Sequence, residues 1–257
     1  MSAFSRRAVL RLAGIGALCL ARPGFAEESR LDRLILQARS FAFVGERMGF
    51  ISRALLGSPY IGRTLIGGPA EPEHFVLRDD GFDCVTFCET VLAAARARAP
   101  EEFANELRRI RYRGGEVEWF SRNHYFAEWG LNNIANGMLR PVVLPGASLR
   151  HKTVDYMPEL GVRRLAFAAV PSASLIAHGD RLLTGDVVGF LSRRPGLDCF
   201  HTGLIVVADN GALSLRHASK SRGRVLDQPL AEFLAENGVR NVAIWRPLEA
   251  AVLDVIV

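Results

Sequence analysis

The sequence lacks the short motifs on which several common enzyme chemistries depend. It contains no His-Glu-x-x-His helix for zinc, no Gly-x-Ser-x-Gly nucleophile turn and no Gly-Lys-Ser/Thr phosphate loop. Its 4 cysteines include no Cys-x-x-Cys pair, and four histidines show no shared metal-ligand spacing: His74, His124, His151 and His178. We therefore expect neither a metal ion nor an organic cofactor.

Long apolar segments are scarce, with one exception near the start of the chain. A basic stretch containing Arg6-Arg7 precedes an apolar run over 12–21, and Ala26 offers a small residue for cleavage. This pattern predicts a secretory signal over residues 1–26. The paired arginines favour a twin-arginine export signal over an ordinary Sec signal. We expect a periplasmic or secreted protein without stable membrane insertion after cleavage, because no other apolar run approaches the roughly 18 residues that span a bilayer.

The chain after this leader also lacks a marked excess of positive or negative charge. The formal net charge is +5, but four of the 32 basic residues lie in the leader and none of the 27 acidic residues does. Residues 27–257 therefore carry 28 basic and 27 acidic residues, a net charge near +1. This balance gives no reason to expect a nucleic-acid partner. We expect the protein to be a monomer.

Among the three cysteines that follow the leader, Cys84 is placed for chemistry. An odd number of cysteines leaves at least one free thiol in an oxidising compartment. Asp83 is a good N-cap for a helix predicted over 83–98. Cys84 thus begins a helix, where unpaired N–H groups favour the reactive thiolate. Cys88, one turn later, is expected to face the core.

Two histidines flank a predicted hairpin late in the chain. A two-residue turn would point His201 and His217 to opposite faces. A three-residue loop over 208–210 would oppose the two rings directly. A five-residue loop over 208–212 would oppose His201 to Ser219, with His217 diagonal on the same face. Cooperation between the histidines therefore requires an odd loop or a bulge.

Helical patterns come first in the chain and strand patterns last, which favours an α+β fold. The length of 257 residues, with 49% hydrophobic and 23% charged residues, suits one globular domain over 27–257. Residues 137–182 are mixed in character and are interpreted as an insertion. Helices are expected over 28–57 (one or two), 83–98, 101–111 and 123–136, a loop over 58–81, and strands over 187–191, 200–208, 212–217 and 242–245.

An aromatic-rich run over 119–129 admits two interpretations. In one, Tyr125, Phe126 and Trp129 pack in the core as part of an amphipathic helix. In the other, the run forms a wall of a substrate cleft, where aromatic faces suit sugar rings and Arg122 suits a carboxylate. The residues alone leave both open. Alternation along the strand also predicts that Cys199 and His201 share one face.

The motifs resemble those of the NlpC-type papain-like cell-wall hydrolases, over most of residues 55–247. The similarity is best to the N-acetylmuramoyl-L-alanine amidase-like branch, although Thr86 and Lys220 depart from the superfamily's common Gly and Ser. The matching segments are Pro59-Tyr60, Asp83-Cys84-Val85-Thr86-Phe87, Arg122-x-His124-Tyr125-x-x-x-Trp129, Gly196-Leu197-Asp198-x-x-His201-x-Gly203 and His217-Ala218-Ser219.

The resemblance implies a papain-like fold in which N-terminal helices, including the nucleophile helix, pack on a C-terminal antiparallel sheet or half-barrel. It implies an exported cysteine amidase acting on peptidoglycan or muropeptides. The implied catalytic residues are Cys84, His201 as the base and His217 to orient it. The implied oxyanion and substrate-binding residues are Tyr60, Asp83, Arg122, His124, Tyr125, Trp129 and Ser219.

Two alternatives accompany this interpretation. A γ-D-glutamyl-diamino-acid endopeptidase of the same superfamily would use Asp83 to hold a free peptide N-terminus. An inactive wall-binding protein is the non-enzymatic alternative, and the presence of Cys84, His201 and His217 argues against it.

Overall fold

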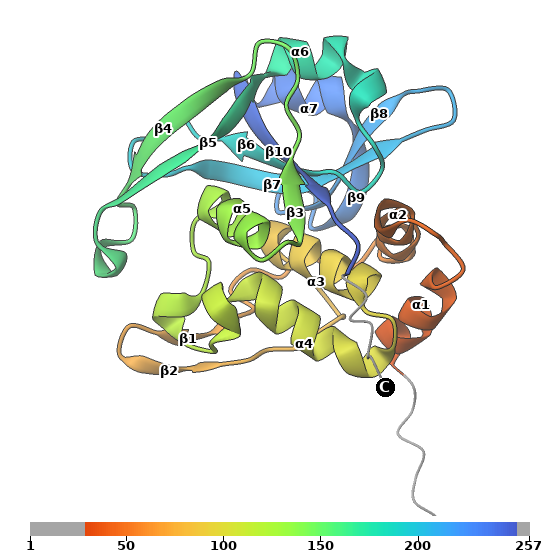
Figure 1. Cartoon of the computed structure of the whole chain (residues 1–257), viewed down its shortest axis with the longest axis vertical. Helices are drawn as coiled ribbons and strands as arrows, with labels where there is room; N and C mark the ends of the chain where they lie inside the picture. Colours follow the sequence, from red (N-terminus) through yellow and green to blue (C-terminus); the bar gives the residue numbers. More distant parts are fainter. Residues whose placement is uncertain (1–28, 251–257) are drawn as a thin grey trace, which may run out of the picture.

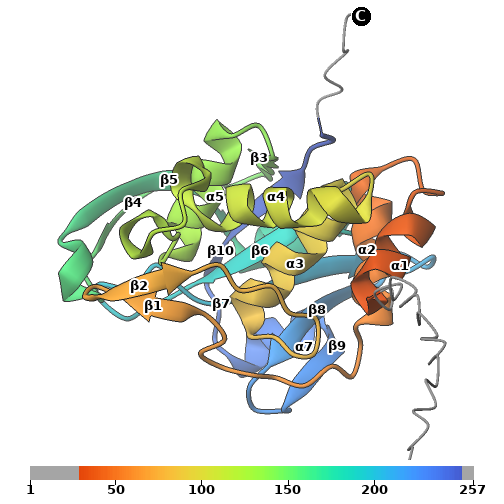
Figure 2. The same ribbon diagram turned by 90° about the horizontal axis from the view of Figure 1, so that it is seen from below.

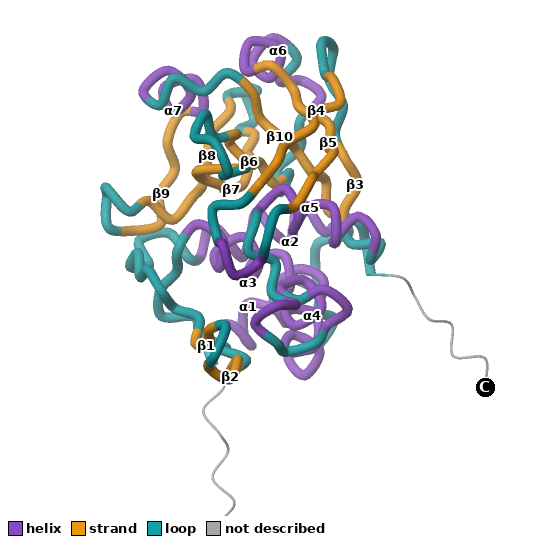
Figure 3. Tube along the Cα trace, turned by 90° about the vertical axis from the view of Figure 1, so that its left-hand side faces the viewer, coloured by secondary structure: helices purple, strands orange, loops and turns teal. Residues whose placement is uncertain are grey.

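The computed structural model describes residues 29–250, which form layers of helices around one large antiparallel sheet (Figure 1). The predicted signal over 1–26 lies outside these residues. Helices α1 to α5 lie against one face of the sheet, and the short helices α6 and α7 cover the other (Figures 1 and 3). The α+β prediction is confirmed. Among the described helices, none combines the length and apolar character that crossing a bilayer requires.

The five helices of the first layer follow the sequence expectations closely. Ser29 caps α1 through a capping box with Asp32, and Pro100 occupies the first turn of α4, where its missing N–H costs nothing. The expected helical segment over 28–57 is two helices. The bounds are α1 Arg30–Ala38, α2 Val44–Ala54, α3 Cys84–Arg96, α4 Pro100–Arg111 and α5 Phe126–Ala135.

The sheet runs in the order β4-β5-β10-β6-β7-β8-β9, with β3 also paired to β10. Its neighbouring strands are antiparallel throughout. The four strands expected from the sequence are present. The bounds are β3 Leu139–Pro141, β4 Ser148–Val154, β5 Arg163–Pro171, β6 Val187–Leu191, β7 Cys199–Val207, β8 Leu213–Ser219, β9 Arg224–Pro229 and β10 Asn241–Pro247.

Several elements depart from the expectations. The segment over 58–81 is not all loop, because it contains the small hairpin of β1 (Ile66–Gly68) and β2 (Glu71–His74). The segment over 137–182 supplies β3, β4, β5 and the short helix α6 (Ser172–Ala177), so it extends the sheet. β9 and the helix α7 (Leu230–Glu236) were not expected, because at 6 and 7 residues they are too short to establish a clear period.

Two apolar clusters lie on the two faces of the sheet. The first packs α1 to α5 against the sheet and includes Phe87, Trp129 and Leu204. The second lies under α6 and α7 and includes Phe190 and Phe233. Figure 2, seen from the helical side, shows α3 crossing in front of the strands. The first turn of α3 thereby meets the strands that carry the two histidines, since α3 packs on β7 and β8.

Candidate functional site

Cys84 is the first residue of α3, as the N-cap at Asp83 predicts. The Asp83 carboxylate accepts hydrogen bonds from the N–H groups of Val85 and Thr86 at 3.0 and 2.8 Å. The Thr86 hydroxyl in turn accepts from the Asp83 N–H at 3.0 Å. The N–H of Cys84 is not used by the cap and lies beside the sulfur of the same residue. The cap therefore fixes the helix start and leaves this N–H for the reacting group.

The Cys84 thiol is half-buried, and its surroundings favour the protonated form. Burial raises its pKa to about 12, and the charge of Asp83 adds to this. The nearby N–H groups of Thr202, Cys84 and Val85 oppose the rise without cancelling it. The sequence expectation of a low-pKa thiolate is thus not met, because loss of water around the sulfur outweighs the partial positive charge of the helix end. A proton acceptor must therefore act as the thiol reacts.

His201 and His217 form a direct pair. His201 Nε2 lies 2.7 Å from His217 Nδ1, with the rings nearly perpendicular at 85°. The ladder between β7 and β8, from Leu204 opposite Arg216 to Val207 opposite Leu213, places Ser219 opposite His201 and His217 on the diagonal. The five-residue loop is thus the alternative that occurs, and the prediction that an odd loop joins cooperating histidines is confirmed.

The histidine pair is held against aromatic rings. Phe233 of α7 lies 5.4 Å from each imidazole, and Phe190 stacks on His201 at 6.2 Å. Burial, with a smaller effect from His217, lowers the pKa of His201 to about 3. Burial also lowers the pKa of His217 to about 4. Both rings are neutral at physiological pH, so His201 is available as a base.

Cys84 lies on the α3 side of β7, whereas the His201 ring lies on the other face, against Phe190 and Phe233. The Thr202 N–H lies beside the Cys84 sulfur, and Thr202 is the residue after His201. No hydrogen bond joins Cys84 to His201 in residues 29–250, and catalytic hydrogen bonds often tighten only when substrate binds. His201 Nε2 lies against His217 Nδ1, so within residues 29–250 Nδ1 is the nitrogen of the His201 ring that has no hydrogen-bond partner.

The prediction that Cys199 and His201 share a face is wrong. The pairing of β6 with β7 shifts by one residue, with Phe190 opposite His201 but Leu191 opposite Cys199. Cys199 therefore packs in the first cluster, whereas His201 stacks on a ring of the second. A bulge of this kind breaks the period-two rule locally. The three cysteines of the described chain are free thiols.

A cleft of about 720 Å³ opens beside the histidines, and we call it the histidine cleft. Its walls come from the start of β7, the turn between β8 and β9, and α7. Ser219 accepts a hydrogen bond from the Arg222 N–H at 3.3 Å and lies 3.2 Å from the Ser221 hydroxyl. The cleft is lined by Phe200, His201, His217, Ser219, Lys220, Ser221, Arg222, Gln228, Phe233, Glu236 and Asn237.

Tyr60 and Asp83 both lie by the nucleophile. The Tyr60 N–H donates to the Gly223 carbonyl at 2.9 Å, which joins the tyrosine loop to the turn between β8 and β9. Burial, followed by the charges of Cys84 and Asp83, raises the pKa of Tyr60, so its hydroxyl remains a donor. Asp83 uses only Oδ1 in capping, and Oδ2 has no hydrogen-bond partner in the described chain.

The polar side chains of the aromatic run form hydrogen bonds and an ion pair with other groups of the protein. Arg122 pairs with Glu73 at 2.8 Å, and the Tyr112 hydroxyl donates to the same carboxylate. His124 Nε2 lies 2.7 Å from the Trp119 carbonyl, and burial lowers its pKa to about 4. The Arg122 charge is thus already matched by a buried partner, which argues against the expected substrate contact.

The aromatic residues of this run are core residues. Trp129 is completely buried and stacks on Phe126 at 4.7 Å. Tyr125 is 1% exposed, and its hydroxyl accepts from the Met157 N–H at 3.0 Å. The core interpretation is confirmed, and Tyr125 and Trp129 do not line the histidine cleft.

The sequence reasoning missed two residues of the site. Thr202 contacts the helix layer, with its hydroxyl 3.7 Å from the Cys88 sulfur. Its place next to His201 was a usable signal, because alternation turns it toward α3. Phe233 lies in the short helix α7, far along the chain, and no local pattern pointed to the histidines. Across the described chain, no group of three or more His, Cys, Asp or Glu side chains is arranged to hold a metal ion.

Comparison with known proteins gives two kinds of similarity. Residues 50–239 match the family model described as AmiA-like, N-acetylmuramoyl-L-alanine amidase-like. An N-acetylmuramoyl-L-alanine amidase from Bacteroides uniformis is 28% identical with a TM-score of 0.70, over 80% of this chain and 99% of that one. A Legionella pneumophila protein, 21% identical with a TM-score of 0.75 over 86% and 94% of the two chains, shares the fold. No curated protein matches the chain.

Proposed function

The chain belongs to the N-acetylmuramoyl-L-alanine amidase-like family, and from that premise we propose that it is a cysteine amidase. Its substrate is peptidoglycan or a muropeptide, and the bond it hydrolyses joins the lactyl group of N-acetylmuramic acid to L-alanine. One observation carries the proposal. The thiol at the start of α3 lies beside the peptide that follows His201, and His201 is paired with His217 at 2.7 Å.

The first half of the reaction transfers the acyl group to sulfur. His201 Nδ1 takes the thiol proton as Cys84 Sγ bonds to the amide carbon. His201 then returns that proton to the departing nitrogen, the C–N bond breaks, and the L-alanine end of the peptide leaves as an amine. Because the resting thiol and imidazole are both neutral, proton transfer accompanies the attack. His217 accepts from His201 Nε2–H and so fixes the tautomer in which Nδ1 is the basic nitrogen.

Two donors suit the oxyanion that forms during attack. The Cys84 N–H is unused by the helix cap, and the protonated Tyr60 hydroxyl lies by the same thiol. Donors fixed in advance stabilise developing charge without reorganisation. In the second half, His201 removes a proton from water, which attacks the thioester. The lactyl group leaves as a free carboxylic acid and the thiol is restored.

The remaining features of the proposal extend beyond the family. We propose a papain-like, NlpC-type fold for the catalytic domain over 27–257, with 137–182 as an insertion. We propose that residues 1–26 direct export through a twin-arginine route to the periplasm or the exterior, and that the mature protein is a monomer. The order of helices before strands and the position of Cys84 at a helix start support the fold proposal.

An endopeptidase that cuts after γ-D-glutamate remains the second candidate. The observation that favours it is the unpartnered Asp83 Oδ2, which is free to pair with a peptide N-terminus. Digestion of a defined disaccharide-peptide followed by mass spectrometry separates the two activities. Release of an intact stem peptide and a free disaccharide supports the amidase, whereas cleavage within the stem supports the endopeptidase. If neither the lactyl–L-alanine amide nor a bond within the stem is cleaved in repeated digests of intact wall and muropeptides, both activities are excluded.

A further inference from the structure

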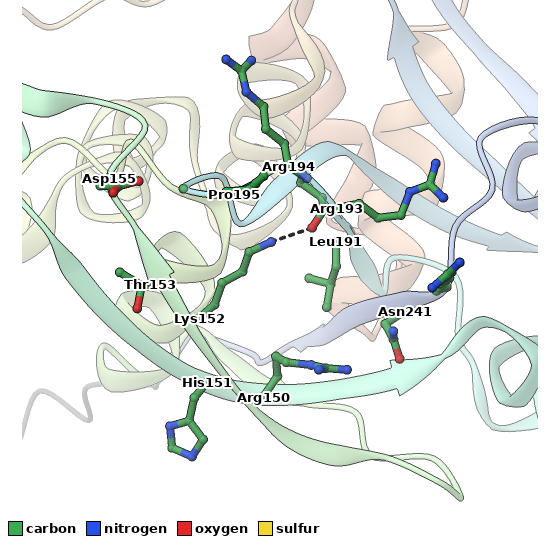
Figure 4. Close-up of a pocket in the computed structure, with 13 residues that line it drawn as sticks. Arg150, His151, Lys152, Thr153, Asp155, Leu191, Arg193, Arg194, Pro195 and Asn241 are labelled. Carbon is green, nitrogen blue, oxygen red and sulfur yellow. Dashed lines mark hydrogen bonds between the residues drawn. The ribbon is translucent and has the colours of Figure 1, made fainter.

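A second cavity of about 560 Å³ lies outside the histidine cleft and is strongly basic (Figure 4). It lies between the β4–β5 ribbon, the connection from β6 to β7 and the start of β10. Its cationic side chains include Arg150, Lys152, Arg193 and Arg240, and Asp155 is the one acidic residue in its lining. We call it the arginine pocket.

The arginines of this pocket have no anionic partner within the described protein. None of the ion pairs in residues 29–250 includes Arg150, Arg193 or Arg240. Elsewhere in the same residues, Arg96, Arg111 and Arg122 are each paired with a buried carboxylate. Guanidinium groups gathered without counter-charges repel one another, so the pocket is suited to an anionic ligand.

The walls of the pocket are fixed in place. Lys152 of β4 donates to the carbonyls of Ser192 and Asp198 at 2.6 and 3.2 Å, and the first of these bonds is drawn in Figure 4. The N–H groups of Asp155 and Tyr156 both donate to the Gly196 carbonyl at 3.1 Å. These bonds tie the ribbon to the β6–β7 connection, so the backbone of the pocket needs little ordering when a ligand binds, whereas its exposed arginine side chains become ordered on the ligand.

The arginine pocket adjoins the histidine cleft. The connection from α7 to β10 separates them, with Asn237 lining the cleft and Arg240 lining the pocket. Arg193 Nη2 comes within 3.9 Å of the position that a Cβ on Gly238 would take. Leu191 of the pocket is paired with Cys199, two residues before His201 in the same strand.

We propose that the arginine pocket binds the carboxylates of the substrate's peptide stem beyond its first residue. The inference rests on the proposed amidase function. An extended chain advances about 3.3–3.6 Å per residue, so the second and third stem residues lie roughly 7–11 Å from the scissile amide. The acidic second residue and a diamino acid with a free carboxylate supply anions at that distance. Arg150 and Arg193 are the contacts that hold them.

Kinetics on substrates of two lengths test this contact. Arg150→Gln/Arg193→Gln is expected to raise KM for a disaccharide-tripeptide about tenfold, as the loss of roughly 1.4 kcal/mol of binding requires. The same variant is expected to leave KM for a disaccharide carrying L-alanine alone unchanged. The matched control is Arg164→Gln, an exposed arginine on β5 that does not line the pocket. An equal effect on both substrates, or none on either, would overturn the proposal.

Binding to the inactive full-length Cys84→Ala variant separates this inference from the proposed reaction. The free tripeptide of the stem is expected to bind, and its fully amidated form to bind at least tenfold more weakly. Millimolar inorganic phosphate is a competitor in a third arm. Equal affinity for the free and the amidated tripeptide would contradict the carboxylate assignment. So would displacement of the peptide by phosphate if Arg150→Gln/Arg193→Gln did not change the affinity for the peptide. If the wild-type protein hydrolyses no substrate but the peptide still binds, the proposed amidase function is rejected and the proposed carboxylate site stands.

Discussion

The first turn of α3 and the aromatic run over 119–129 both border the first apolar cluster. They differ in how many of their polar groups have hydrogen-bond partners within the protein. Around Cys84, one oxygen of Asp83 has no hydrogen-bond partner in the described chain, and the thiol is approached by backbone N–H groups. Around Arg122, the guanidinium, the Tyr112 hydroxyl and the carboxylate of Glu73 are all joined.

This difference separates a reactive region from a structural one. A polar group at the edge of a cleft that has no protein partner can exchange water for substrate. A buried polar group is stable only when its partners are supplied by the fold. The aromatic segment satisfies that requirement at Arg122, His124 and Tyr125, and so it has little left to offer a ligand.

Substitution of the two cysteines of α3 gives the largest expected difference. Cys84→Ala is predicted to lower kcat by at least about 10³-fold, because it removes the thiol that begins α3 and lies beside the N–H of Thr202. Cys88→Ala, one turn further into the core, is the matched control and is expected to keep activity within a few-fold. Measurement of kcat for both, with circular dichroism to confirm folding, checks this. An equal loss of kcat in the two variants would show that Cys84 is not the nucleophile.

Loss of the Arg122 partner is expected to act on stability. Arg122→Met leaves the Glu73 carboxylate buried and unpaired, since its side chain is only 1% exposed. We expect the free energy of unfolding to fall by about 3–5 kcal/mol in urea titrations. The double variant Arg122→Met/Glu73→Met is expected to recover most of that loss. A rise in KM with unchanged unfolding would instead make Arg122 a substrate contact.

A smaller effect on stability is expected at Trp129. Trp129→Phe leaves a cavity beside Phe126 and Trp245, and the expected destabilisation is about 1–2 kcal/mol. KM measured well below the unfolding temperature is expected to remain unchanged. If KM rose several-fold without a shift in thermal unfolding, the cleft-wall interpretation of the aromatic segment would be restored.

The pH dependence gives the smallest but most specific test of the histidine environment. Burial lowers the pKa of His201 to about 3, so the base stays neutral and kcat/KM is expected to be nearly flat from pH 7 to 5. Activity is lost only as pH falls through that low value. An acid limb near 6.5 would show that His201 is solvated as in a peptide.

The same histidines couple stability to pH. Unfolded histidines take up protons below about pH 6.5, whereas the folded rings of His124, His201 and His217 resist protonation. The stability gained by keeping them neutral is therefore complete above about 6.5 and declines as pH falls toward 4. Thermal unfolding followed across this range measures the effect.

Local patterns predicted the elements that begin at strong boundaries. Asp83 predicted the start of α3. The five-residue loop after Val207 was one of the odd loop lengths predicted for a hairpin whose two histidines cooperate. These are contacts between residues near in sequence, where period and capping decide the structure.

The contacts that sequence reasoning could not supply are long-range ones. Glu73 and Arg122 are 49 residues apart, and nothing local to either indicates the other. The bulge that separates Cys199 from His201 depends on the register of β6, which alternation within β7 does not contain. The unpaired arginines of the pocket come from three separate segments that only the sheet brings together.

The central claim is that acyl transfer passes through the Cys84 sulfur. Its most direct test is acid quenching of the wild-type enzyme during the first turnover of a disaccharide-peptide, followed by peptide mapping by mass spectrometry. The predicted result is a disaccharide-lactyl thioester on the peptide that carries Cys84, formed as the stem peptide is released. An adduct on Cys88 or Cys199, or continued turnover by Cys84→Ala, would contradict the claim.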